Sequence, residues 1–191
     1  MIKNLCAALL LSASVSANAQ DTENSRKFIS VSGEAGFVLN SDMDKTFGLG
    51  GTVSYMVQDM IFNHAKNYVT VGLKGFSNPY SGGKFISNIG NNKNDGMNYS
   101  ALLGGYRFIF DTVQNGWYVE PRLGVAMAGG NYFGAIIAPK AGLTYNNWDF
   151  AAFTDLSFGG ENNLGKNSFA TAGLGIGYIF GLSHKTSRRV N

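Results

Sequence analysis

Residues 117–127 read WYVEPRLGVAM, a stretch in which neighbouring residues differ in polarity. Successive side chains of an extended strand point to opposite faces. One face of this stretch therefore carries only apolar residues: Trp117, Val119, Pro121, Leu123, Val125 and Met127. The other face carries Tyr118, Glu120, Arg122, Gly124 and Ala126. If the charged face points inward, this is the pattern of a strand in a membrane β-barrel.

The same alternation occurs in seven other segments. Together they predict eight strands, over residues 28–39, 47–57, 68–76, 99–110, 117–128, 135–145, 148–158 and 169–180. Each has at least 9 residues, whereas strands of soluble proteins have about 5 or 6 and a tilted membrane strand needs about 9 to 11. The predicted fold is therefore all-β, an eight-stranded antiparallel up-and-down transmembrane barrel.

The inward face of these strands is predicted to hold eight charges, four acidic and four basic: Glu34, Lys74, Arg107, Glu120, Arg122, Lys140, Asp149 and Asp155. An eight-stranded barrel is just wide enough to be filled by its own side chains, so opposite charges should pair there and form a polar filling. A selective ion pore favours rings of one sign instead. We expect Glu120 and Arg122 to belong to one network; for Glu34 and Lys74, solvation above the membrane is an open alternative.

Aromatic residues gather near the predicted strand ends, where interfacial belts of membrane proteins lie. One belt would comprise Tyr55, Phe110, Trp117, Tyr145, Trp148 and Tyr178, and the other Phe37, Phe47, Phe158 and Phe169. The predicted connections between strands also fall into two groups, one for each end of the barrel. Odd-numbered connections include the long segment 78–97, and even-numbered ones include a two-residue hairpin at Asn146 and Asn147. Long external loops and short periplasmic turns are typical of outer-membrane barrels.

The first residues indicate export. Lys3, an apolar core of about 11 residues and an A-x-A pattern at Ala17 and Ala19 predict a cleaved signal peptide over residues 1–19. Residues 20–27 would then form a short periplasmic segment, 28–180 the barrel and 181–191 a periplasmic tail. Cys6, the sole cysteine, would leave with the signal, which excludes disulfides and thiolate metal sites in the mature chain.

These features resemble the small outer-membrane β-barrel proteins, the OmpA/OmpX-like group of Gram-negative envelopes. The resemblance rests on the signal, the eight strands, the uneven loops, the segment YVEPRLGVAMAGG and the closing GLGIGYIF. It implies an outer-membrane location, contact with lipid and lipopolysaccharide, and insertion by the barrel-assembly machinery. In that group the last strand usually ends the chain with an aromatic residue. Phe180 matches this feature, although GLSHKTSRRVN follows it.

No catalytic or cofactor chemistry is predicted. Acyl transfer or hydrolysis uses a serine, a histidine and a carboxylate, and the two histidines, His64 and His184, fall in a turn and in the tail. Two distant histidines make a transition-metal site improbable, and the single short basic tail gives no nucleic-acid footprint. The sequence therefore predicts a protein that is not an enzyme and that has no cofactor or metal.

A structural and surface-interaction role is the predicted function, with loop 78–97 as the candidate for an extracellular ligand, because loops of this length are usually functional or disordered. Three alternatives stay open at this point. They are a narrow transporter or pore for small solutes, a lipid A-modifying enzyme, and a soluble lipocalin-like carrier.

Overall fold

The computed structural model describes residues 27–39, 47–59, 66–78, 97–128, 132–160 and 168–182. Several sequence predictions lie outside these ranges: the signal peptide, His64, His184, the interior of loop 78–97 and the tail beyond Leu182.

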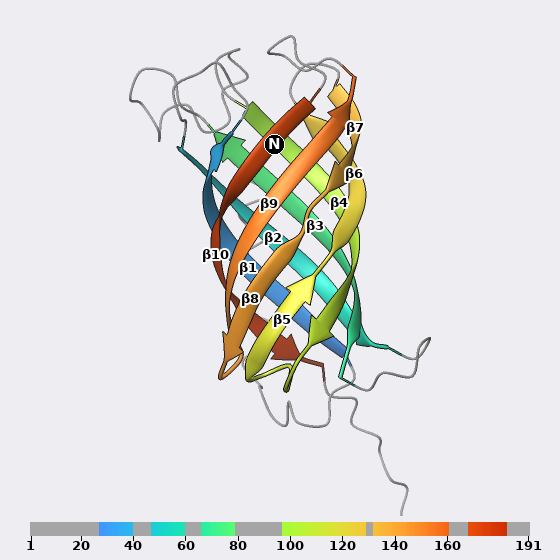
Figure 1. Ribbon diagram of the computed structural model, residues 1–191, viewed down its shortest axis with the longest axis vertical. Coiled ribbons are helices and arrows are strands. Elements are labelled where there is room, and N and C mark those ends of the chain that lie inside the picture. The colour runs from blue at the N-terminus through green and yellow to red at the C-terminus, as the bar shows by residue number, and fades with distance from the viewer. Residues whose placement is uncertain are drawn as a thin grey trace, which may run out of the picture.

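The described residues form one antiparallel sheet that closes on itself (Figure 1). Closure occurs where the first strand pairs with the last, with Ile29 opposite Phe180. The strands are β1 (Lys27–Val38), β2 (Phe47–Gln58), β3 (Tyr68–Asn78), β4 (Met97–Ile109), β5 (Gly116–Glu120), β6 (Arg122–Ala128), β7 (Tyr132–Ile137), β8 (Lys140–Tyr145), β9 (Trp148–Gly159) and β10 (Ser168–Gly181).

These ten segments are eight barrel strands, because two strands are each interrupted at a proline. Pro121 separates β5 from β6, and Pro139 lies between β7 and β8. The pairing continues across both breaks: Tyr106 N donates to Pro121 O at 3.2 Å and Thr154 N donates to Pro139 O at 3.1 Å. Each proline carbonyl thus accepts a hydrogen bond of the sheet, but proline has no N–H to donate one to the neighbouring strand. The predicted eight-stranded fold is confirmed, but its fifth and sixth strands are interrupted, and the sixth begins at Tyr132, inside the predicted fifth connection.

The predicted hairpin between β8 and β9 is also confirmed. Asn146 and Asn147 have φ of 49° and 67°, and Tyr145 pairs with Trp148. Positive φ at both central residues is the requirement of a type I′ turn, whose twist matches that of the flanking strands. This hairpin lies at the end of the barrel where β1 begins and β10 finishes (Figure 1), and Leu182 N donates to Lys27 O there at 2.9 Å. We call it the short-turn end.

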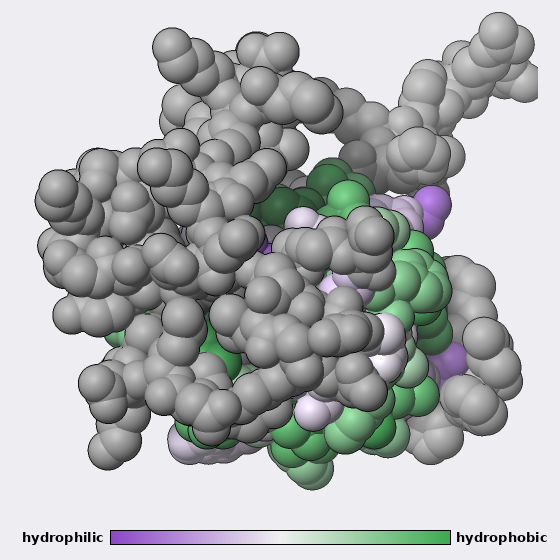
Figure 2. Space-filling view, turned by 90° about the horizontal axis from the view of Figure 1, so that it is seen from above, coloured by the Kyte–Doolittle hydropathy of each residue, from purple (hydrophilic) through white to green (hydrophobic). Residues whose placement is uncertain are grey.

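The outer wall of the barrel is apolar. Apart from Lys27, the first residue of β1, no outward-facing residue of the described strands is charged. Many large hydrophobic side chains on the wall are exposed, up to 69% of their surface at Leu174. Viewed along the barrel, most of the surface that the grey atoms leave visible is hydrophobic (Figure 2). This is the reverse of a soluble protein, in which such residues lie mostly inside.

The sequence predicted a polar filling for the barrel, but the interior also holds apolar residues. Two apolar clusters lie along it. One contains Phe28, Met56, Tyr68 and Tyr118, and the other contains Phe76, Tyr99, Tyr132, Phe153 and Phe169 with smaller residues.

Phe169 corrects the predicted outer aromatic belt, because it is 2% exposed and its ring packs inside against Tyr99, with centroids 4.7 Å apart. The period-two alternation explains this. Leu174 faces outward, so every odd-numbered residue of β10 faces the interior.

Strands β1 and β10 approach so closely at Gly173 that there is no room for a side chain. A Cβ on Gly173 would lie 2.1 Å from Ala35 O, whereas a Cβ on Gly75 would meet nothing within 4 Å. We expect Gly173→Ala to destabilise the barrel by about 1–3 kcal/mol, the usual range for overpacking. Gly75→Ala, the matched control, should be neutral or slightly stabilising. Urea unfolding in detergent micelles measures both, and equal stabilities of the two variants would contradict the expectation.

Candidate functional site: the charged interior

All eight charged residues predicted to face inward are buried, with exposed fractions of 0% to 6%. Glu34 and Lys74 are 4% and 2% exposed, which contradicts the alternative that they are solvated above the membrane. Burying an ion costs several kcal/mol unless partners compensate its charge. The arrangement of partners is therefore the central feature of the site.

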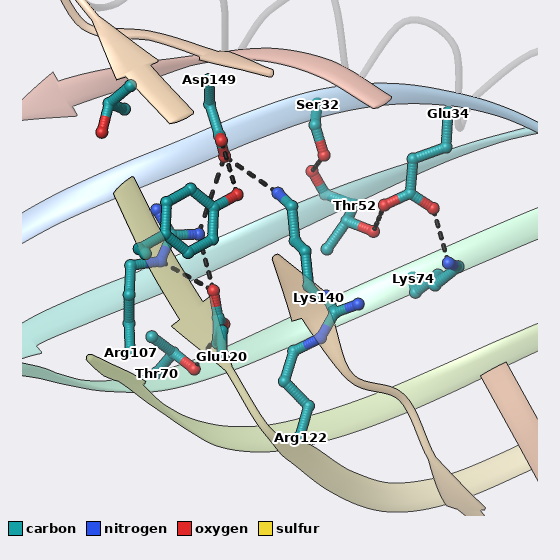
Figure 3. A network of polar contacts seen from close by, with 12 residues as sticks. Ser32, Glu34, Thr52, Thr70, Lys74, Arg107, Glu120, Arg122, Lys140 and Asp149 are labelled. Atoms are coloured by element: carbon teal, nitrogen blue, oxygen red, sulfur yellow. Dashed lines mark hydrogen bonds and ion pairs between the residues drawn. The ribbon is translucent and has the colours of Figure 1, made fainter. Parts of the chain in front are cut away.

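The first set of partners is built around Arg107 on β4 and Glu120 on β5 (Figure 3). Arg107 places both Nε and Nη2 at 2.7 Å from Glu120 Oε2. The other carboxylate oxygen, Oε1, accepts a hydrogen bond of 2.9 Å from Thr70 Oγ1 on β3. Both oxygens of Glu120 are thus satisfied by side chains from two neighbouring strands.

Asp149 on β9 extends this set across the barrel. Its Oδ1 accepts a hydrogen bond of 2.5 Å from Tyr118 OH, and its Oδ2 lies 2.9 Å from Lys140 Nζ and 3.6 Å from Arg107 Nη2. The Arg107 guanidinium also stacks over the Tyr118 ring, 4.0 Å from its centroid, where a cation–π attraction applies. We call these six residues, Thr70, Arg107, Tyr118, Glu120, Lys140 and Asp149, the Arg107 network; its four ionised groups sum to zero charge.

A second set is built around Lys74 on β3. Lys74 Nζ lies 2.6 Å from Glu34 Oε2 on β1 and 2.7 Å from Asp155 Oδ2 on β9, so one ammonium joins three strands. It also sits 3.7 Å from the centroid of the Phe153 ring.

Neutral hydroxyl groups complete this second set. Thr52 Oγ1 donates to Glu34 Oε1 at 2.8 Å, and Thr171 Oγ1 donates to Asp155 Oδ2 at 3.1 Å. Tyr99 OH also donates to Asp155. We call Glu34, Thr52, Lys74, Tyr99, Asp155 and Thr171 the Lys74 network; it holds two carboxylates and one ammonium.

The prediction that Glu120 and Arg122 belong to one network of contacts is wrong. Within the described residues, no carboxylate oxygen lies within 4.0 Å of an Arg122 nitrogen; its Nε donates to Ala138 O at 2.8 Å. The reason is geometric. Phe108 pairs with Val119, so Arg107 lies directly opposite Glu120. Opposed Cβ atoms are about 4.5–5.5 Å apart, closer than residues two apart on one strand, which rise by about 6.6 Å.

Sequence reasoning missed the tyrosines that serve the carboxylates, although the parity of Tyr118 placed it on the charged face. It also missed Asp59, which is 4% exposed after the end of β2 and accepts a hydrogen bond from Tyr106 OH. Within the described ranges, no three histidine, cysteine or acidic side chains are grouped to hold a metal ion. The ion pairs of the interior therefore connect strands that are distant in the sequence.

Comparison with solved structures bears on the fold. The neisserial surface protein A matches with a TM-score of 0.57 and 15% identity, over 83% of this chain and 98% of that one. The N-terminal β-barrel domain of OprF from Pseudomonas aeruginosa matches with 0.56 and 16%, over 82% and 100%. The chain has the fold of small outer-membrane β-barrel proteins. Ail, the attachment invasion locus protein of Yersinia pestis, matches this barrel with 0.53 and 13%, over 82% and 99%.

At these identities the comparison concerns the barrel's fold alone. No protein-family model matches the sequence, and no curated protein matches it either.

Proposed function

We propose that this protein is a non-conducting outer-membrane barrel with a structural and surface-interaction role. The observation that carries the proposal is the combination of an apolar wall, charged only at Lys27 among the described strands, with an interior of opposite charges in direct contact. Paired charges leave no ring of one sign with which to select ions. Apolar clusters lie along the same interior as the two networks, and a path through the barrel would have to displace both.

The wall supports membrane insertion over a soluble carrier. The uninterrupted strands have 11 to 14 residues, enough to cross the hydrocarbon core when tilted. Leu73, in the middle of β3, exposes 65% of its surface, and Leu102 of the neighbouring β4 exposes 50%. A continuous apolar surface of this extent marks contact with lipid or another apolar partner.

A leucine-to-arginine pair tests this placement. Leu73→Arg should destabilise the barrel in phospholipid vesicles by about 2–4 kcal/mol, the range for arginine at the bilayer midplane. Leu39→Arg, at the residue that follows β1 and has 59% exposure, should have an effect of about 0–1 kcal/mol, because it lies near the interface. Urea unfolding of vesicle-inserted protein gives both values. Two effects within about 0.5 kcal/mol of zero, as for surface positions of a soluble protein, would support the soluble carrier instead.

Cell fractionation tests the location directly. The full chain should sediment with outer membranes and should migrate faster on gels before boiling than after it, because a folded barrel resists detergent. Recovery in the soluble periplasmic fraction, with no heat-dependent shift, would refute the proposal.

The surface role is assigned to loop 78–97. Deleting residues 80–95 should leave the heat-dependent gel shift intact. It should abolish the binding of intact bacterial cells to host cells or to serum proteins. Adhesion that is the same with and without the loop would move the role elsewhere.

A further inference from the structure

Three buried charged groups inside the barrel, those of Arg107, Arg122 and Asp155, each keep one polar atom without a partner among the described residues, and two of these atoms belong to residues that a single strand separates. The two are Arg122 Nη2 and Asp155 Oδ1, on side chains that are 3% and 0% exposed. Leaving a buried donor or acceptor unsatisfied costs about 1–3 kcal/mol, and more for a charged group. One is a donor and the other an acceptor, so a single ligand can satisfy both.

The strand register places the two residues on either side of Ala138. Leu123 pairs with Ile137, which puts Arg122 opposite Ala138, and Ile137 pairs with Leu156, which puts Ala138 opposite Asp155. All three residues face the interior. Arg122 Nε donates to Ala138 O at 2.8 Å, so the guanidinium already lies against the strand that separates it from Asp155.

One strand separates the two side chains. Directly opposed Cβ atoms are about 4.5–5.5 Å apart, which puts the Cβ atoms of Arg122 and Asp155 about 10 Å apart across one strand. That strand contributes only the methyl group of Ala138. The two charged groups do not approach within 4.0 Å of each other.

We propose that one buried water molecule bridges Arg122 Nη2 and Asp155 Oδ1 beside Ala138. Buried waters typically make about three hydrogen bonds to polar groups that would otherwise be unsatisfied. The site favours a neutral ligand that both donates and accepts. A bound anion would meet the Asp155 carboxylate, and a bound cation would meet the Arg122 guanidinium.

The bridge would also link two groups of opposite charge. The Lys74 network has one negative charge in excess, and Arg122 carries the positive charge that offsets it. The water would connect Arg122 to Asp155 of that network, and so place the offsetting charge beside the excess one.

A crystal structure of the refolded full-length barrel, at a resolution that shows ordered water, tests the bridge. We expect a density peak at about 2.7–3.2 Å from both atoms. A second crystal soaked in sodium bromide should show no anomalous signal there. A direct ion pair between Arg122 and Asp155, the absence of a peak, or a bromide signal would each overturn the proposal.

A double-mutant cycle gives a second, independent readout. Arg122→Met and Asp155→Asn should lower the midpoint of thermal unfolding by less in combination than the sum of their separate effects, because either change alone already removes the bridge. Arg122→Met combined with Tyr132→Phe, which removes an uncharged hydrogen bond to Ser157, should be additive. Additivity in both pairs would refute the bridge.

Discussion

Replacing Lys74 by methionine should lower the free energy of unfolding more than any other single change in the barrel. The ammonium contacts both Glu34 and Asp155, at 2.6 Å and 2.7 Å, so its removal leaves two carboxylates buried without the cation that they share. Breaking one buried pair by removing a partner costs about 3–5 kcal/mol. The loss here should reach at least that range, because two pairs are broken together.

Two further variants make this result interpretable. Lys27→Met removes a lysine from the exposed start of β1 and should change stability by less than about 0.5 kcal/mol. The triple variant Lys74→Met, Glu34→Gln and Asp155→Asn removes all three charges and should recover part of the stability that the single change loses, as buried ion pairs replaced by neutral groups often do. Urea unfolding in micelles gives all three values. A triple variant less stable than the single one would contradict the account.

The second large effect is expected at Glu120. Glu120→Gln removes the carboxylate that Arg107 contacts through Nε and Nη2, and should cost about 3–5 kcal/mol. The loss should be smaller than at Lys74, because Asp149 lies 3.6 Å from Arg107 and still offsets part of its charge. Combining Glu120→Gln with Arg107→Met should restore part of the stability, since the remaining Lys140 and Asp149 form a neutral pair at 2.9 Å.

Arg122 supplies the matched control for this prediction. It is an equally buried arginine on the same inner face, two residues from Glu120. A double-mutant cycle should give a strong coupling between Glu120 and Arg107 and a weaker one between Glu120 and Arg122. Thermal unfolding followed by the heat-dependent gel shift measures both couplings. A stronger coupling to Arg122 would restore the pairing that the sequence suggested and refute the contacts described above.

The fold was predictable because period-two alternation assigns each residue to a face. From Trp117 to Met127 the apolar set faces outward, and Tyr118, Glu120, Arg122 and Ala126 are buried or face inward, as expected. The alternation continues through Pro121 without a shift. The Asn146 and Asn147 turn was predictable for a local reason, since asparagine tolerates the positive φ that the turn requires.

The partners of the charges were not predictable in the same way. Alternation places Glu120 and Arg122 on one face but does not give the register between strands, and register determines which residue lies opposite Glu120. A shift of two residues between β4 and β5 would keep every face unchanged and would give Glu120 another partner. Phe169 was misassigned because residue type was weighed above parity at that position.

Electrical recording from planar lipid bilayers tests the central claim most directly. Insertion of the refolded protein is first verified by its heat-dependent gel shift after recovery from vesicles of the same lipid. We predict no stepwise conductance above the bare bilayer in 1 M KCl, because paired charges and apolar clusters occupy the interior. Reproducible current steps that scale with the amount of inserted protein would contradict a closed barrel and would support the narrow pore.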